Sequence, residues 1–159
     1  MKNEMRIEFD AISENEGLAR VVIAAFVSNA DPTVEQVEDV KTAVSEAVTN
    51  AIIHGYKEQG GRVVMQARLS EEGELTVDIM DEGVGIADVE QAMQPLFTTG
   101  PENERSGMGF SFMEAFMDGL HVQSSLGKGT HVHMWKRFEC SQAQSAPILQ
   151  AAVWNRSRL

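Results

Sequence analysis

The sequence has only one cysteine and fewer basic than acidic residues, and each of these shortages excludes a class of protein. Cys140 is the only cysteine, so an internal disulfide framework is excluded and a reducing compartment is indicated. The 13 Lys and Arg residues are outnumbered by 24 Asp and Glu residues, which leaves a net charge of -11. This charge argues against direct binding of nucleic acid, because phosphates would be repelled, and it suits a protein that meets a basic partner.

Long apolar segments are missing as well. The longest uncharged apolar run, residues 21–27, is too short to span a bilayer. Residues 1–10 are charged and lack the apolar centre of a signal peptide. We therefore expect a cytoplasmic protein without a membrane partner.

The composition that is present indicates a globular domain. Of the 159 residues, 43% are hydrophobic and 23% are charged, which suits one domain with a real core and excludes wholesale disorder. No internal repeat is visible. We expect a single domain over residues 1–138, followed by a disordered or artificially added tail at 139–159, which has no clear period.

Alternating and helical spacings predict the elements of this domain. Alternation of apolar and polar residues predicts strands at 5–11, 62–69, 75–79, 120–125 and 130–138. Helical spacing predicts helices at 13–29, 33–56 and 109–117, with a helical turn at 88–93. The tight turn between the second and third strands predicts that they pair antiparallel. The irregular stretch 85–107 is long for a compact domain, which is typical of a functional loop or of disorder.

Two helices begin with the pattern of a capping box, in which a Ser or Thr side chain and a Glu or Gln side chain three residues later cap each other's backbone. Ser13 with Glu16 has this pattern, and so has Thr33 with Gln36. We expect both boxes to form.

Glu46 and Asn50 stand four residues apart on the helix at 33–56, so they share one face. The apolar row on the other side is formed by Val37, Val40, Val44, Val48 and Ala51. A carboxylate can accept a proton and an amide oxygen can bind Mg²⁺. Taken alone, such a pair is more often a solvated helix face.

Asp81 follows a strand and continues its buried row, so its carboxylate is expected to point inward, where it needs hydrogen-bond donors. The exocyclic amine of adenine together with a water would supply them. Gly83 and Gly85 would let the backbone come close to such a ligand. The simpler interpretation is a turn that ends a strand.

Two further glycine motifs follow. Ser106 to Gly109 precedes a helix, where exposed backbone N–H groups can bind phosphate oxygens, although Gly-x-Gly alone is a weak signal. The motif at 127–130 is most often a hairpin turn, and its Thr130 could also reach the nucleotide.

Taken in order, these motifs resemble the ATP-binding domain shared by gyrase-type ATPases, ninety-kilodalton heat-shock chaperones, sensor histidine kinases and mismatch-repair ATPases. The resemblance covers residues 33–138 and implies an α/β fold, a two-layer sandwich of a mixed β-sheet packed on α-helices, with an ATP lid. It implies ATP or ADP as ligand, with Asn50 on Mg²⁺ and Asp81 on adenine. The other nucleotide contacts that it implies are Gly83, Gly85, Thr99, Gly107, Met108, Gly109 and Thr130.

Longer stretches at 45–56, 95–99 and 104–110 closely resemble the bacterial anti-sigma serine kinases of the sporulation type. That resemblance implies a protein that binds and silences a sigma factor, of the sigma F type, and phosphorylates a serine of an anti-anti-sigma protein, usually as a homodimer. Glu46 would then accept the proton of the attacking serine. Arg105 would reach the γ-phosphate in the manner of an arginine finger, and its alternative is a solvated charge on the lid.

Two other functions remain open at this point. One is a binding module in which the nucleotide only sets the conformation that holds a partner, and the other is a detached catalytic domain of a histidine kinase. Glu46 argues against both, because a pure binder needs no base and histidine kinases usually lack this glutamate.

Arg20 and the histidines need separate interpretations. Arg20 is the only charge between Leu18 and Asn29 in an apolar helix, so it either extends to water from a core helix or contacts a partner, and we expect the partner contact. We interpret His54 as structural. His131 and His133 share a strand face, but no cysteine or third histidine accompanies them, so we do not expect a metal there.

Overall fold

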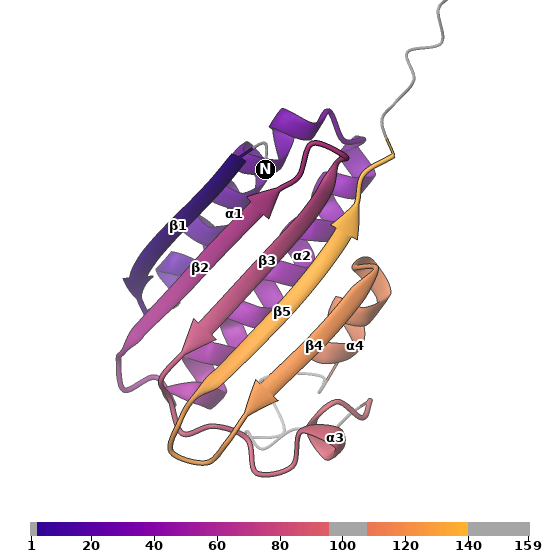
Figure 1. Cartoon of the computed structure of the whole chain (residues 1–159). Coiled ribbons are helices and arrows are strands. Elements are labelled where there is room, and N and C mark those ends of the chain that lie inside the picture. Colours follow the sequence, from indigo (N-terminus) through magenta and orange to yellow (C-terminus); the bar gives the residue numbers. More distant parts are fainter. Residues whose placement is uncertain (1–2, 96–107, 140–159) are drawn as a thin grey trace, which may run out of the picture.

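The structure is a computed structural model that describes residues 3–95 and 108–139. It has two layers, a five-stranded sheet and a layer of helices that covers one of its faces (Figure 1). The strands lie in the order β1-β2-β3-β5-β4. Their bounds are β1 Asn3–Asp10, β2 Arg62–Leu69, β3 Glu74–Asp81, β4 Gly119–Ser124 and β5 Thr130–Arg137.

The helical layer is formed mainly by two long helices that pack side by side behind the sheet (Figure 1). The helices are α1 Glu14–Val27, α2 Val34–Asn50, the short α3 Val89–Ala92 and α4 Gly109–Phe116. A 3-10 turn, Ser28–Ala30, follows α1, and a π-helical turn, Ala51–Gly55, follows α2. Within the described residues, no helix has the length and apolarity that crossing a membrane requires.

The core lies between the layers, where the predicted apolar rows meet. In β2 every second residue from Val63 to Leu69 is buried, and in β3 so are Leu75, Val77 and Ile79. On α2, the predicted row is buried from Val40 onward, and Val37 is half-buried. The alternation in strands and the 3.6-residue spacing in the helix therefore predicted the two surfaces that form the core.

The two-layer α/β sandwich is confirmed, but its sheet is not mixed. Each strand pair of the described residues is antiparallel. The reason is that β1 and β2 are joined by two helices, which bring the chain back to the end of the sheet where β1 ended. β3 and β4 do run in the same direction, but β5 lies between them and pairs antiparallel with both.

The two predicted capping boxes have different outcomes. At the start of α2, the Gln36 N–H donates to Thr33 Oγ1 (3.2 Å) and the Thr33 N–H donates to Gln36 Oε1 (3.0 Å), so this box is confirmed. At the start of α1 the prediction was wrong, since Ser13 makes no side-chain cap hydrogen bond. Glu16 is instead held by the hydroxyl of Ser45 from α2.

The end of α2 also differs from the prediction of a continuous helix to residue 56. The backbone widens into the π-turn after Asn50, and the N–H of Tyr56 donates to the carbonyl of Ala51. The turn brings the Gly55 carbonyl to the N–H of Val84 at 2.8 Å, which ties the helical layer to the loop after β3. Single π-turns of this kind are frequent at functional sites.

Candidate functional site

A cavity of about 780 Å³ lies between α2, the loop after β3 and the beginning of α4. Such a volume is within the ordinary range for small-molecule and cofactor sites. The predicted residues that line it are Glu46, Asn50, Asp81, Gly85, Met108, Gly109 and Thr130. Motifs that are distant in the sequence are therefore brought to one cavity.

Glu46 and Asn50 lie one helical turn apart on α2 and face the first residue of α4. A Cβ atom on Gly109 would stand 3.2 Å from Glu46 Oε2 and 3.3 Å from Asn50 Oδ1. Any side chain at position 109 would therefore crowd the carboxylate and the amide. Glycine at this position leaves the beginning of α4, where backbone N–H groups have no partner within the helix itself, next to both polar groups.

Asp81 is the last residue of β3, and its carboxylate is half-buried at the other part of the cavity. Burial raises the pKa of Asp81, and hydrogen bonds from the backbone N–H groups of Gly83 and Thr130 act in the opposite direction. The Gly83 N–H donates to Oδ1 at 2.8 Å. The carboxylate points inward, as predicted, and the donors that the structure shows for it are backbone N–H groups of the protein itself.

The glycines after Asp81 allow three segments of backbone to meet around it. A Cβ on Gly83 would stand 2.3 Å from the carbonyl carbon of Gly55, so only glycine permits this contact with the π-turn. Gly85 has a φ of +74°, which favours glycine, and a Cβ there would stand 2.0 Å from the carbonyl oxygen of Ser125. The loop after β3 is thus packed between the end of α2 and the β4–β5 turn.

Thr130 begins β5 directly opposite Asp81 in the antiparallel register. Its hydroxyl lies 2.9 Å from the hydroxyl of Ser124, which also donates to the carbonyl of Gly129 and accepts from the N–H of Ile86. This network fixes the loop after β3 against the β4–β5 hairpin. It holds Thr130 at the wall of the cavity.

The residues around the cavity fit a nucleotide and its metal ion. A carboxylate that meets donors at one part suits an amine-bearing base, and the backbone N–H groups at the start of α4 suit phosphate oxygens. The Asn50 side chain next to them offers the oxygen that a hard cation such as Mg²⁺ takes. The apolar lining between these groups comes from Ile79, Val84, Ile86, Ala92, Leu126 and Val132.

Some of these site residues were not singled out from the sequence. Val84 and Ile86 are apolar residues within an irregular glycine loop, which is the only signal that could have indicated them. His54, interpreted as structural, also lines the cavity. The predicted residues Thr99, Arg105 and Gly107 lie outside the described residues.

Arg20 lies on α1 and is not among the residues that line the cavity. Its side chain is 41% exposed, and Nη1 is 3.8 Å from Glu16 Oε1. Leu18 and Val21 beside it are 46% and 67% exposed, so the apolar character of α1 extends to its outer surface. The helix is therefore buried on one side only, through Ala19, Ile23, Phe26 and Val27.

Known proteins resemble this chain in sequence and in fold. Residues 9–136 match the family described as the histidine kinase-like ATPase domain. The anti-sigma F factor of Clostridium acetobutylicum is 56% identical over 138 residues, which cover 87% of this chain and 96% of that protein. The anti-sigma F factor of Geobacillus sp. (strain WCH70) is 54% identical over 143 residues, which cover 90% of this chain and 98% of that protein.

Solved structures show the same fold at lower identity. The RsbU and RsbW domains of a Mycobacterium tuberculosis protein match with a TM-score of 0.62 and 21% identity, covering 86% of this chain and 32% of that one. The mycobacterial sensor histidine kinase MprB matches with a TM-score of 0.54 and 17% identity, covering 86% of this chain and 99% of that one.

Proposed function

Since this chain belongs to the histidine kinase-like ATPase family, and within it to the family of the anti-sigma F factors, we propose that it is an ATP-dependent serine kinase that also inhibits a sigma factor. The sigma factor would be of the sporulation, sigma F type. The kinase substrate would be a serine of an anti-anti-sigma protein. The working form would be a cytoplasmic homodimer, as the resemblance of its motifs implies.

The observation that supports the kinase activity most strongly is the position of Glu46. Its carboxylate lies beside Asn50 and against Gly109, at the part of the cavity suited to phosphates. A protein that only binds the nucleotide needs no proton acceptor there. A kinase needs one within reach of the attacking hydroxyl.

In the proposed reaction Glu46 takes the proton from the serine hydroxyl. The serine oxygen then forms a bond to the γ-phosphorus, the bond to the β,γ-bridging oxygen breaks, and ADP leaves with that oxygen. Mg²⁺ held by the phosphates and Asn50 would neutralise the charge on the transferring group. The N–H groups at Met108 and Gly109 would hold phosphate oxygens, as helix N-termini do.

The remaining roles are those that the resemblance of the motifs to the family implies. Asp81 would select adenine, with Gly83, Gly85 and Thr130 around it. Thr99 and Gly107 would contact the nucleotide, and Arg105 would stabilise the γ-phosphate during transfer.

The direct test is incubation of the chain with γ-labelled ATP, Mg²⁺ and a candidate anti-anti-sigma protein. We expect label on one serine, stable to acid, and no label when that serine is replaced by alanine. ATP binding and sigma-factor binding without any transfer would favour the nucleotide-gated binding module. Label that is lost in acid would indicate phosphohistidine, and hence the histidine-kinase alternative.

We predict that Arg20→Glu reduces affinity for the sigma factor about 30-fold or more, because a truncated interface hot spot typically costs about 2 kcal/mol. A guanidinium beside the exposed Leu18 and Val21 offers a two-pronged donor next to an apolar surface. Folding stability should fall little, since the ion pair with Glu16 is long and partly exposed. Calorimetry of sigma binding, ATP binding and thermal unfolding measures all three.

Arg6→Glu is the matched control for this variant. Arg6 is exposed on β1 and contacts Gln66 at 3.4 Å, so the same charge reversal is made away from α1. The control should bind the sigma factor as the wild type does. If Arg20→Glu binds normally, or melts early, Arg20 only supports the scaffold.

A further inference from the structure

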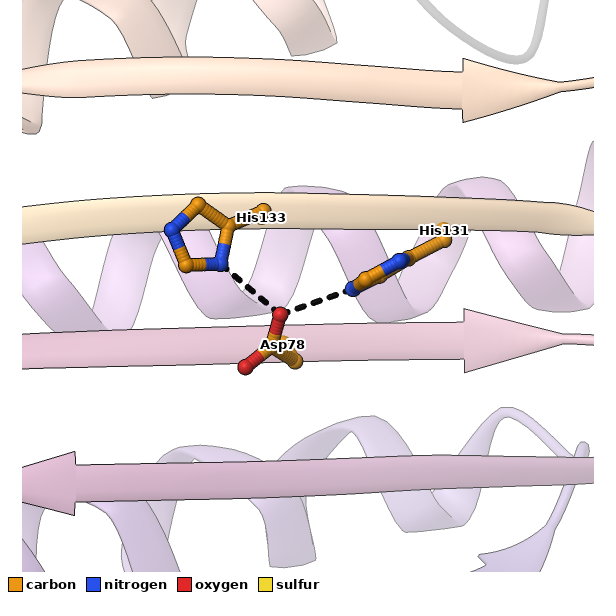
Figure 2. Close-up of side chains that lie close together, drawn as sticks. All are labelled: Asp78, His131 and His133. Atoms are coloured by element: carbon orange, nitrogen blue, oxygen red, sulfur yellow. Dashed lines mark hydrogen bonds and ion pairs between the residues drawn. The ribbon is translucent and has the colours of Figure 1, made fainter.

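The face of the sheet that the helices leave uncovered carries the only buried charged side chain of the described residues, Asp78. Asp78 is 6% exposed although it lies on the open face (Figure 2). Side chains from both neighbouring strands surround it. This burial is unexplained by the nucleotide site, which lies between the sheet and the helices.

Two histidines converge on one oxygen of Asp78. His131 Nε2 is 2.7 Å and His133 Nδ1 is 2.8 Å from Asp78 Oδ1. The register explains the convergence, because Asp78 pairs directly with His133, and His131 lies two residues earlier on the same face of β5. Figure 2 shows both rings pointing from β5 toward the carboxylate on β3.

The second oxygen of Asp78 has a different neighbour. Arg68 Nη1 lies 3.4 Å from Asp78 Oδ2, and Arg68 Nε also pairs with Glu4 at 3.0 Å. The guanidinium charge is therefore shared with Glu4 and directed to the oxygen that the histidines do not contact. Desolvation raises the pKa of Asp78, but its hydrogen bonds to His133 and His131 outweigh it, so the pKa of this carboxyl lies below its ordinary value.

We propose that Asp78, His131 and His133 form a site for a divalent transition-metal ion, with Zn²⁺ as its foremost occupant. Their three ligand atoms all lie within 4.8 Å of one another. In a tetrahedral zinc site with bonds of about 2.0–2.1 Å, ligand atoms stand about 3.4 Å apart, so small side-chain movements are enough. Two imidazoles and one carboxylate are donors that suit zinc and not Mg²⁺, which prefers oxygen ligands.

Metal binding and the hydrogen bonds use the same atoms. On binding, each imidazole would carry its proton on its other ring nitrogen, His131 on Nδ1 and His133 on Nε2, and water would complete the coordination on the open side. The ion would join β3 to β5. These strands also carry Asp81 and Thr130. The proposed metal site therefore lies close to the proposed nucleotide site, although on the opposite face of the sheet.

The test measures Zn²⁺ binding by the full chain without nucleotide, in competition with a chromogenic chelator and in excess Mg²⁺. We expect one Zn²⁺ per chain. Asp78→Asn, His131→Gln and His133→Gln should each lower the affinity for Zn²⁺ at least about tenfold. Mutating residues that only support a metal ligand already lowers metal affinity by about that factor. Saturating Zn²⁺ should raise the melting temperature of the wild type by about 5 °C or more.

Two variants serve as matched controls. His121 lies directly opposite His133 on β4 but is not one of the three ligands, so His121→Gln should bind Zn²⁺ as the wild type does. Cys140→Ser should do the same and excludes the only thiol.

A measurement on the unmodified chain covers the case in which a ligand variant fails to fold. Of the four histidines, His131 and His133 should show the large Zn²⁺-dependent ring-nitrogen NMR shifts that direct coordination produces, while His121, directly opposite His133, should show only small shifts from proximity. Less than one bound Zn²⁺ per chain, coordination-type shifts at His54 or His121, or full binding by a His131→Gln, His133→Gln double variant would overturn the proposal.

Discussion

Glu46→Gln should reduce phosphoryl transfer by about 10² to 10⁴, the usual contribution of a positioned general base, while nucleotide affinity stays near that of the wild type. Glutamine keeps the volume of the side chain that packs against Gly109, so the cavity wall should be preserved. It cannot take the proton from the serine hydroxyl. Single-turnover transfer from labelled ATP measures the rate, and calorimetry with a non-hydrolysable ATP analogue measures binding.

Two further variants distinguish the base from the metal ligand. Asn50→Ala, one turn along the same face of α2, should weaken Mg²⁺-dependent nucleotide binding as well as transfer. Glu35→Gln changes an exposed glutamate in the first turn of the same helix and should alter neither. Normal transfer by Glu46→Gln would mean that the proton is accepted elsewhere.

Local periodicity predicted most of the helices and strands, because one face of each element packs on the core and the other faces water. β2 has the bounds expected from its alternation, and α4 ends within one residue of its predicted end. The cap at Thr33 was predictable because its two hydrogen bonds join residues only three apart. Interactions of this kind depend on nearby sequence and little else.

Contacts between distant segments were not predictable in the same way. At the start of α1 the backbone of Ser13 is itself helical, with φ -58° and ψ -33°, which is not the extended conformation of a capping residue, and the Glu16 carboxylate accepts from Ser45 on the neighbouring helix. The π-turn after Asn50 arises where Gly55 must reach the loop after β3. Neither partner can be identified from the spacing of residues along one element.

In the candidate site, too, local contacts could be predicted and contacts between distant segments could not. Glu46 and Asn50 are related by one helical turn, so their proximity could be predicted from the sequence. That they share a site with Gly109 could be predicted only from the resemblance of the ordered motifs to a known family, because no local sequence pattern relates α2 to α4. Asp78 was missed for the same reason, because its contact with His131 and His133 depends on the register between β3 and β5.

Asp81→Asn should weaken ATP binding about a hundredfold and change GTP binding far less. Asparagine keeps the volume and an oxygen for the Gly83 N–H, so the loop after β3 should stay in place. Asparagine lacks the charged acceptor for the adenine amine, and a hydrogen bond to a charged group contributes about 1.5–3 kcal/mol. The asparagine amide could also place its own N–H donor against the donor of the adenine amine. Calorimetry with both nucleotides measures the difference.

The stability of this variant should change in the opposite direction from its affinity. Burial raises the pKa of Asp81, so its folded-state contribution to stability is present below the ordinary aspartate pKa and is lost as pH rises through the raised value. At neutral pH the charged carboxylate therefore costs stability, and Asp81→Asn without nucleotide should melt at or above the wild-type temperature. This difference should disappear in acid.

Asp88→Asn is the matched control, because Asp88 lines the same cavity but its carboxylate caps α3 by accepting from the Gln91 N–H at 2.9 Å. It should bind ATP much as the wild type does, since its oxygen is engaged by the helix and not by the base. Equal ATP affinity for Asp81→Asn and the wild type would show that this carboxylate does not bind the adenine. Equal losses for ATP and GTP in a variant with an unchanged melting temperature would place the carboxylate at a part of the nucleotide that both share.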